Sequence, residues 1–229
     1  MGRPMRIVIA ILFPATLLGL AAADPGDGDP VARGRELFHD RQLGDYPSCA
    51  DCHSLLPEEQ ELEEAKHLGP GATLHGAAVR EGWRNMNTFE DVGDASQKCA
   101  KTWQKRKGGL DEKQRADLAA FLAGHAPEGA LPKREVQRKP KRLEELDGGD
   151  AEKGQQLTER YCGNCHDKAE DALSFPFEPQ RRKKDQVARK VRGYDARGKF
   201  KPQEGTMSYY TNDRLPDEEL RDILAYVAK

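Results

Sequence analysis

Two copies of one five-residue pattern constrain this chain more than any other feature. Residues 49–53 read CADCH and residues 162–166 read CGNCH, so both have the form C-x-x-C-H. Two cysteines at this spacing can each form a thioether bond to one vinyl group of a haem, and the adjacent histidine then reaches the iron. The pattern therefore predicts two covalently bound haem c groups. A zinc site or a thiol redox pair is the alternative for each copy.

The motifs assign a role to each of their cysteines and histidines. The predicted attachment sites and proximal iron ligands are, in chain order, Cys49, Cys52, His53, Cys162, Cys165 and His166. Aromatic residues make up only 7% of the chain and charged residues 33%, so ordinary side chains offer little apolar surface for a core. A haem in each half would supply that surface, and we therefore expect folding to depend on the cofactors.

The first 23 residues have the organisation of a secretory signal peptide. Arg3 and Arg6 form a positive region, an apolar run follows over 7–20, and small residues precede a cleavage site near Ala23. The run is shorter than a membrane span of about 20 residues and contains a proline, although an uncleaved anchor is the alternative. Cleavage would leave no stable membrane span and would place the protein in the periplasm. Export fits the motifs, because thioether attachment is completed outside the cytoplasm.

The chain after residue 23 contains an internal repeat, in which the same order of predicted elements occurs twice. Predicted helices at 29–38 and 150–160 each precede a C-x-x-C-H motif. Predicted amphipathic helices at 110–122 and 215–227 end the two halves, and both have acidic residues in the first turn. No segment shows the alternation expected of a strand. The pattern predicts an all-α chain.

The repeat also predicts the domain boundaries. A first domain would cover 24–126 and a second 149–229, joined by a linker at 127–148 that is rich in Pro, Gly, Lys and Arg. Gly34 and Gly154 occupy corresponding places in the two halves. A glycine on a helix face allows another helix to approach closely.

This layout closely resembles the class I cytochrome c fold. In that family an N-terminal helix crosses a C-terminal helix, C-x-x-C-H follows the first, and the distal ligand lies on a loop before the last. The resemblance covers nearly all of the chain after residue 23. It implies two tandem class I cytochrome c domains, each wrapped around one covalent haem.

A proline-containing loop adds to the resemblance in the first half. Residues 68–76 (LGPGATLHG) are similar to the family's G-P-x-L-x-G loop, with two extra residues. In that family the proline carbonyl accepts a hydrogen bond from the proximal histidine, which is His53 here, and so orients the imidazole. The second half lacks this loop, and Pro176 or Pro179 is the candidate replacement.

Met207 is the predicted distal ligand in the second half. It lies 41 residues after His166 and just before the last predicted helix, where the family carries its axial methionine. A methionine that fills a gap in the core is the alternative. Ligation by histidine and methionine raises the haem potential and suits an electron relay.

The first half has an unusual candidate for its distal ligand. Cys99 lies 46 residues after His53, and it is the one cysteine that the motifs leave over. A coordinated thiolate would stabilise the oxidised state and lower the potential. Ligation by His53 and Cys99 resembles that of thiosulfate dehydrogenases and of the catalytic haem subunit of the sulfur-oxidising complex. Met86 is the main alternative, and His67, His75 or an open site complete the candidates.

Charge is distributed unevenly along the chain. Residues 24–130 carry 13 Lys and Arg against 20 Asp and Glu, whereas residues 131–229 carry 22 against 19. This polarity suggests docking to different partners through different ends, or an ordinary solvated surface. The basic run 181–184 would steer an acidic redox partner or form a solvated helix face, and the acidic run 58–64 is predicted to be an exposed helical insertion. Arg80 resembles the family's arginine near a haem propionate, with a surface arginine as the alternative.

These features favour an exported dihaem cytochrome c that carries electrons between periplasmic redox partners, among them a respiratory or sulfur-oxidation complex. The alternative is an oxidoreductase that resembles thiosulfate dehydrogenase, with Cys99 as the reacting residue at the first haem. Whether the chain is an enzyme stays open, with electron transfer favoured. The basic stretches do not indicate nucleic-acid binding in an exported haem protein.

Overall fold

The structure of the chain is a computed structural model, and it describes residues 28–41, 47–80, 83–85, 87–89, 91–129, 139–166, 182–201 and 208–228. We call residues 28–129 the first half and residues 139–228 the second half. Six predicted features lie outside the described residues: the signal peptide, Met86, Pro176, Pro179, Arg181 and Met207.

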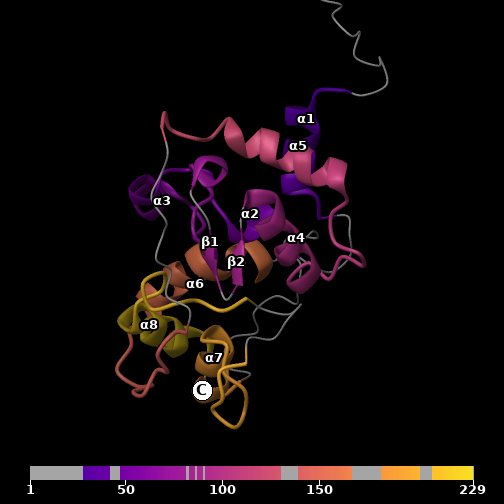
Figure 1. Cartoon of the computed structure of the whole chain (residues 1–229). Coiled ribbons are helices and arrows are strands. Elements are labelled where there is room, and N and C mark those ends of the chain that lie inside the picture. The colour runs from indigo at the N-terminus through magenta and orange to yellow at the C-terminus, as the bar shows by residue number, and fades with distance from the viewer. Residues whose placement is uncertain are drawn as a thin grey trace, which may run out of the picture.

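Helices form nearly all of the regular structure in the described part of the chain (Figure 1). The helices of the first half are α1 (Pro30–His39), α2 (Cys49–Cys52), α3 (Glu58–Glu64), the 3-10 turn η1 (Ala77–Val79), α4 (Val92–Thr102) and α5 (Glu112–Ala123). The helices of the second half are α6 (Ala151–His166), α7 (Lys184–Val191) and α8 (Asp217–Val227). The predicted helical class is therefore confirmed. No described helix is long and apolar enough to cross a membrane.

One short β pair departs from the helical pattern. Strands β1 (Trp83–Asn85) and β2 (Asn87–Phe89) are antiparallel neighbours, and Trp83 pairs with Phe89. The sequence does not predict them, because three residues are too few to show an alternating pattern.

The helix starts follow the signals in the sequence. The Asp29 side chain accepts a hydrogen bond from the Val31 amide at 3.0 Å, and Pro30 occupies the first turn of α1. Asp111 and Gln114 form a reciprocal capping box at the start of α5. These contacts confirm two helices that the sequence predicts.

A helix crossing organises the first half. Helix α1 lies against α5 (Figure 1). Gly34 is so close to α5 that a Cβ atom there would overlap the carbonyl oxygen of Asp117. Arg33 donates to the Asp117 carboxylate through Nε at 2.8 Å and Nη2 at 2.7 Å. The core around this crossing contains Phe38, Ala77, Val92, Ala100, Leu110, Leu118, Phe121 and Leu122.

The second half repeats this crossing. Helix α6 lies against α8, and a Cβ atom at Gly154 would overlap the carbonyl oxygen of Asp222. Lys153, the residue before the glycine, has its Nζ 3.0 Å from the Asp222 carboxylate. In both halves a basic residue followed by glycine therefore meets an aspartate on the last helix.

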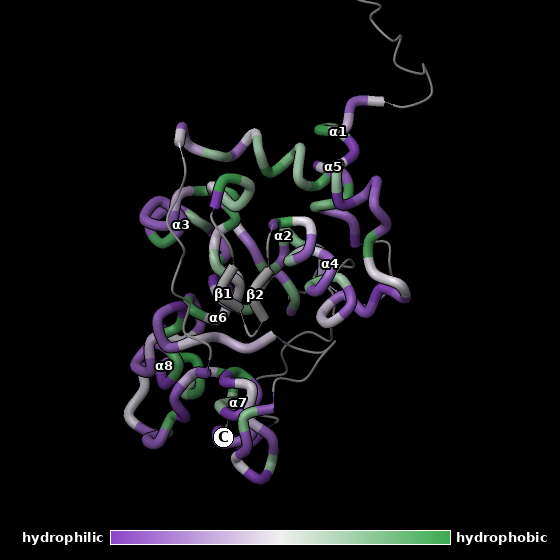
Figure 2. The backbone as a smooth tube through the Cα atoms, viewed as in Figure 1, coloured by the Kyte–Doolittle hydropathy of each residue, from purple (hydrophilic) through white to green (hydrophobic). Residues whose placement is uncertain are grey.

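A second core surrounds α6, α7 and α8. Its buried apolar residues include Leu157, Tyr161, Val191, Leu215, Leu220, Ile223, Leu224 and Val227, together with Leu68 from the first half. Figure 2 shows hydrophobic positions on α5 and α8, whereas the outer loops are mostly hydrophilic. The contribution of Leu68 means that the two halves share part of one core.

The acidic run at 58–64 forms the predicted helix, α3, and most of its residues are exposed, but Glu61 is not. Glu61 is 0% exposed and accepts two hydrogen bonds from Arg214 of the second half, at 2.7 and 2.8 Å. Arg214 also donates to the Gly69 carbonyl at 2.8 Å. The prediction of exposure is therefore wrong for Glu61 alone, because this acid has a buried cationic partner that is far away in the sequence.

Backbone contacts continue this junction. The Leu68 amide donates to the Arg160 carbonyl at 2.8 Å, and the Tyr210 hydroxyl donates to the Leu68 carbonyl at 2.9 Å. Buried ion pairs and buried backbone hydrogen bonds tolerate little displacement, because each unpaired group would be costly. The loop that follows α3 therefore ties the first half to the second.

Residues 139–149 form an extended segment that we call the strap. It covers the described C-terminal part of the predicted linker and contains no helix or strand. Leu143 and Leu146 pack against the second core, and the Pro140 carbonyl accepts a hydrogen bond from the Tyr194 hydroxyl at 2.6 Å. The strap is thus part of the second half rather than a free connection. The boundaries of the linker stay a prediction.

Candidate haem-binding sites

The first motif is held on a single capped turn, α2. The Ser48 amide donates to the Asp51 carboxylate at 2.8 Å, and the Asp51 amide donates to Ser48 Oγ at 3.3 Å. This capping box fixes the turn that carries Cys49 and Cys52. Residues three apart on a helix share one face, so both thiols can reach one ligand.

The imidazole of His53 has a fixed orientation. Its Nδ1 lies 2.7 Å from the Ala72 carbonyl oxygen. Because a carbonyl only accepts, Nδ1 is the donor, and in the neutral imidazole Nε2 then has the lone pair. This is the state that an iron-ligating histidine requires.

The acceptor differs from the one that the resemblance implies. The expected acceptor is the carbonyl of the loop proline, Pro70, whereas the structure uses Ala72, two positions later. The Gly71 amide donates to the Cys52 carbonyl at 2.9 Å, and the Leu74 amide donates to the Ser54 carbonyl at 2.8 Å. These two hydrogen bonds fix the position of the loop relative to the motif. With two extra residues in the loop, the carbonyl that faces His53 belongs to Ala72 instead of Pro70.

Two glycines allow this loop to close on the motif. A Cβ atom at Gly71 would overlap the His53 ring, and one at Gly69 would overlap the Cys52 carbonyl. Real Cβ atoms do not approach so closely, so a side chain at either position would push the loop away from His53. The loop and α2 together therefore fit a covalently attached haem with His53 on its proximal side.

Cys99 lies on α4 and is partly buried. Burial, with a smaller contribution from Cys49, raises the pKa of its thiol to about 12. A charge on Cys99 in turn raises the pKa of Cys52, so Cys99 lies within electrostatic range of both attachment cysteines. The cysteine that the motifs leave over is thus close to the first motif, and only an added cation would make its thiolate the stable form.

The second motif forms the last turn of α6. Cys162 is buried, and burial raises the pKa of its thiol to about 12 and that of Cys165 to about 11. His166 is the final residue of the helix. A long helix that packs on α8 therefore positions this motif, where the first motif depends on a capped single turn.

His67 lies beside the second motif. Its Nδ1 lies 3.0 Å from the Glu159 carbonyl, and a Cβ atom at Gly163 would come 3.0 Å from its ring. Arg80, on the other side of the loop, donates from Nη2 to the His75 carbonyl at 3.5 Å. The roles that the sequence raised for His67 and Arg80 stay predictions.

The two motifs lie beside one another. Arg41 pairs with the Asp51 carboxylate inside the first motif, and its Nη2 also lies 3.3 Å from the Asn164 carbonyl inside the second. Cys52 Sγ is 3.9 Å from Ser208 Oγ, and Ser208 follows Met207 in the chain. The second half thus contributes directly to the surroundings of the first motif.

Sequence reasoning missed the Arg41 bridge and the Glu61–Arg214 pair. The partners are separated by more than 100 residues in each case, so no periodicity or local spacing connects them. The zinc alternative gains no support, because no group of three or more His, Cys, Asp and Glu converges among the residues that the structure describes.

Comparison with known proteins bears on the second half. Residues 151–229 match the family model described as Cytochrome c. The match begins at the start of α6 and includes the second C-x-x-C-H motif. A cytochrome c domain in this segment supports a c-type cytochrome that carries covalent haem c and transfers electrons. No curated protein matches the chain.

Proposed function

We propose that this chain is an exported dihaem c-type cytochrome that passes electrons between periplasmic redox partners. The cytochrome c match over residues 151–229 supports the family and the second haem. The observation that carries the proposal to the first half is the contact between His53 Nδ1 and the Ala72 carbonyl at 2.7 Å. It holds an imidazole beside two attachment thiols in the protonation state that iron needs.

Each half contributes a defined set of residues. Cys162 and Cys165 would hold one haem covalently, with His166 and Met207 as its axial ligands. Cys49 and Cys52 would hold the other, with His53 and either Cys99 or Met86. The haem supplies a one-electron redox change, and the protein sets its potential through burial, axial ligands and hydrogen bonds.

The contact between the motifs favours exchange of electrons within the chain. Arg41 touches both motifs, and Cys52 lies 3.9 Å from Ser208. A thiolate ligand on the first half and a thioether ligand on the second would make the first potential the lower one. Electrons would then run downhill from the first half to the second.

A potentiometric titration of the purified holoprotein tests this arrangement. We expect two one-electron steps, and the Cys99→Ser variant should raise the lower step while leaving the upper one in place. Electron paramagnetic resonance of the oxidised protein gives a second readout, because loss of a thiolate ligand changes the low-spin signal. An unchanged signal in Cys99→Ser would exclude Cys99 and favour Met86, and a single redox step would contradict the dihaem proposal.

A second candidate function is catalytic, and it depends on the position of Cys99 close to the first motif. In an enzyme that resembles thiosulfate dehydrogenase, Cys99 would leave the iron or react with a sulfur substrate at the first haem. Turnover of thiosulfate or tetrathionate with an artificial electron acceptor would establish this alternative. Absence of turnover in the fully haem-loaded protein would leave electron transfer as the function.

A further inference from the structure

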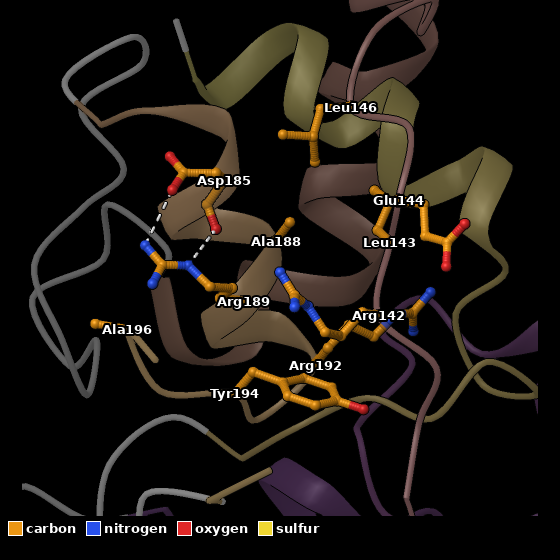
Figure 3. A pocket seen from close by; sticks show the side chains of 10 residues that line it. All are labelled: Arg142, Leu143, Glu144, Leu146, Asp185, Ala188, Arg189, Arg192, Tyr194 and Ala196. Carbon is orange, nitrogen blue, oxygen red and sulfur yellow. Dashed lines mark hydrogen bonds and ion pairs between the residues drawn. The ribbon is translucent and has the colours of Figure 1, made fainter. Parts of the chain in front are cut away.

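The second half contains a cavity of about 500 Å³, and no residue of either C-x-x-C-H motif lines it. Figure 3 shows the side chains of the lining. It lies between the strap and α7 together with the turn that follows α7. Its walls are formed by Arg142, Leu143, Glu144, Leu146, Asp185, Ala188, Arg189, Arg192, Tyr194 and Ala196. No motif cysteine or histidine contributes to it, so the proposed haem-binding function does not account for it.

Three arginines and two acids line the cavity, and one of the arginines, Arg192, is also paired with Asp217 outside the lining. Arg189 is neutralised by Asp185 at 3.0 Å, and a dashed line marks this pair in Figure 3. Arg142 forms no ion pair with any residue that the structure describes, and its guanidinium carbon lies 6.0 Å from the centre of the Tyr194 ring. The strap therefore contributes to the cavity wall a cation, Arg142, that has no ion-pair partner among the described residues.

Arg192 lies in the same wall and is already paired with Asp217 at 2.6 Å. The residue is 1% exposed, and its Nη atoms donate to the Tyr210 and Thr211 carbonyls and to the Asp217 carboxylate. Its Nε is buried and has no hydrogen-bond partner in the described part of the chain. Burial lowers the pKa of Arg192 despite Asp217, so the environment does not fully stabilise this charge.

The remaining wall is apolar. Leu143 and Leu146 face the cavity from the strap, Ala188 from α7, and the Tyr194 ring closes one side. A volume of about 500 Å³ is within the range of small-molecule sites, which combine apolar walls with a few polar groups that fix orientation. Arginine is the side chain best suited to a planar carboxylate, because its donors match both oxygens.

We propose that this cavity binds a small organic carboxylate whose body is apolar. The carboxylate would pair with Arg142, and the body would pack against Leu143, Leu146 and the ring of Tyr194. One wall residue contacts the segment that follows Met207 directly, and a second is connected to it through another aromatic ring. Arg192 holds the carbonyls of Tyr210 and Thr211, and Tyr194 reaches Tyr209 through the ring of Phe200.

Calorimetric titration of the holoprotein with benzoate tests the proposal. Benzamide provides a neutral probe of the same shape, and sulfate provides an anion without an apolar body. We expect one saturable benzoate site, with weaker binding of both other probes. Arg142→Gln should weaken benzoate binding about tenfold, the loss expected for one charge-assisted hydrogen bond.

Lys190→Gln is the matched control. Lys190 is exposed on the same helix, α7, and does not line the cavity, so its loss removes one positive charge without changing the site. We expect benzoate affinity to stay within about twofold of the parent value in this variant, since screened surface charges act weakly at a distance. An unchanged thermal midpoint and haem spectrum would show that both variants fold.

Four results would overturn the proposal. Benzamide binding as tightly as benzoate would remove the charge requirement, and sulfate binding as tightly would remove the apolar one. Equal losses in Arg142→Gln and Lys190→Gln would reduce the effect to general electrostatics. Absence of any benzoate binding would contradict the site itself.

Discussion

The first C-x-x-C-H motif lies on a single turn, α2, whereas the second forms the end of the sixteen-residue helix α6. The helix crossings behind the motifs nevertheless correspond closely. Gly34 meets Asp117 in one half and Gly154 meets Asp222 in the other, with a basic residue before each glycine. The frame of the two halves is thus the same, and the difference lies in what holds the cofactor-attachment residues.

That difference makes the first motif depend on the rest of the molecule. A four-residue helix has almost no stability of its own, so Ser48, Asp51 and Arg41 must fix it. Arg41 reaches the second motif, and the loop that orients His53 is tied to Arg214 and Tyr210. The second motif is continuous with α6, a sixteen-residue helix that packs on α8. We therefore expect disturbance of the junction to affect the first site more than the second.

Loss of the buried acid at the junction should have the largest effect. Glu61→Ala leaves Arg214 buried without its carboxylate, and we expect it to destabilise the protein by about 3–5 kcal/mol. Denaturant unfolding of the holoprotein measures this cost. Glu63→Ala, on the exposed side of the same helix, is the control and should change stability by less than about 0.5 kcal/mol. Equal effects of the two variants would show that the halves are not coupled through Glu61.

The glycines at the two crossings should have the next largest effect. Gly34→Ala and Gly154→Ala each force a Cβ atom into the backbone of the crossing helix, and overpacking of this kind costs about 1–3 kcal/mol or more. Thermal melts should show similar losses in the two variants. Gly28→Ala, which meets nothing within 4 Å, should leave the melting temperature unchanged. A lower melting temperature in only one of the two variants would show that the two helix crossings are not equivalent.

Removal of a helix cap should expose the first motif to hydrogen exchange but not the second. Ser48→Ala deletes the cap of α2, and Asp150→Ala deletes a side chain that accepts from the Glu152 amide at 2.8 Å at the start of α6. Each should cost about 0.5–2 kcal/mol. Hydrogen exchange followed by mass spectrometry should show faster exchange at 49–53 in the first variant. The second variant should leave 162–166 protected, and exposure there would contradict the independence of the second motif.

The smallest effect concerns acid stability. The hydrogen bond from Arg33 lowers the pKa of Asp117, and for Asp222 the contacts from Asp150 and Lys153 outweigh burial and also lower its pKa. A depressed carboxyl pKa gives stability above the unfolded value of about 4, and this stability is lost as the pH falls through the folded value. Asp117→Asn and Asp222→Asn should therefore flatten the melting curve against pH below about pH 4. A flatter pH dependence in only one of the two variants would show that Asp117 and Asp222 do not have equivalent roles.

Local signals predicted most of the helical frame. The caps at Asp29 and Asp111, the apolar spacing of α5 and α8, and the paired glycines all act within one or two turns, so the sequence displays them directly. The attachment motifs are equally local. The strap, by contrast, has the composition of a linker, and its packing depends on partners such as Tyr194 that no spacing reveals.

The errors have a common physical origin in long-range contacts. A run of seven residues rich in glutamate is normally solvated, and only the distant Arg214 makes burial of Glu61 tolerable. The acceptor for His53 moved from Pro70 to Ala72 because bonds to Cys52 and Ser54 set the register of the loop. Both outcomes follow from tertiary hydrogen bonds, and neither leaves a periodic trace in the chain.

The most direct test of the account is the number of haems that each half holds. Intact mass spectrometry of the exported protein should show two covalent haems. Cys49→Ser combined with Cys52→Ser should leave one, and so should Cys162→Ser combined with Cys165→Ser, whereas Cys99→Ser should keep both. A single haem in the parent protein, lost only in the Cys162 and Cys165 variant, would contradict the claim that both halves bind the cofactor.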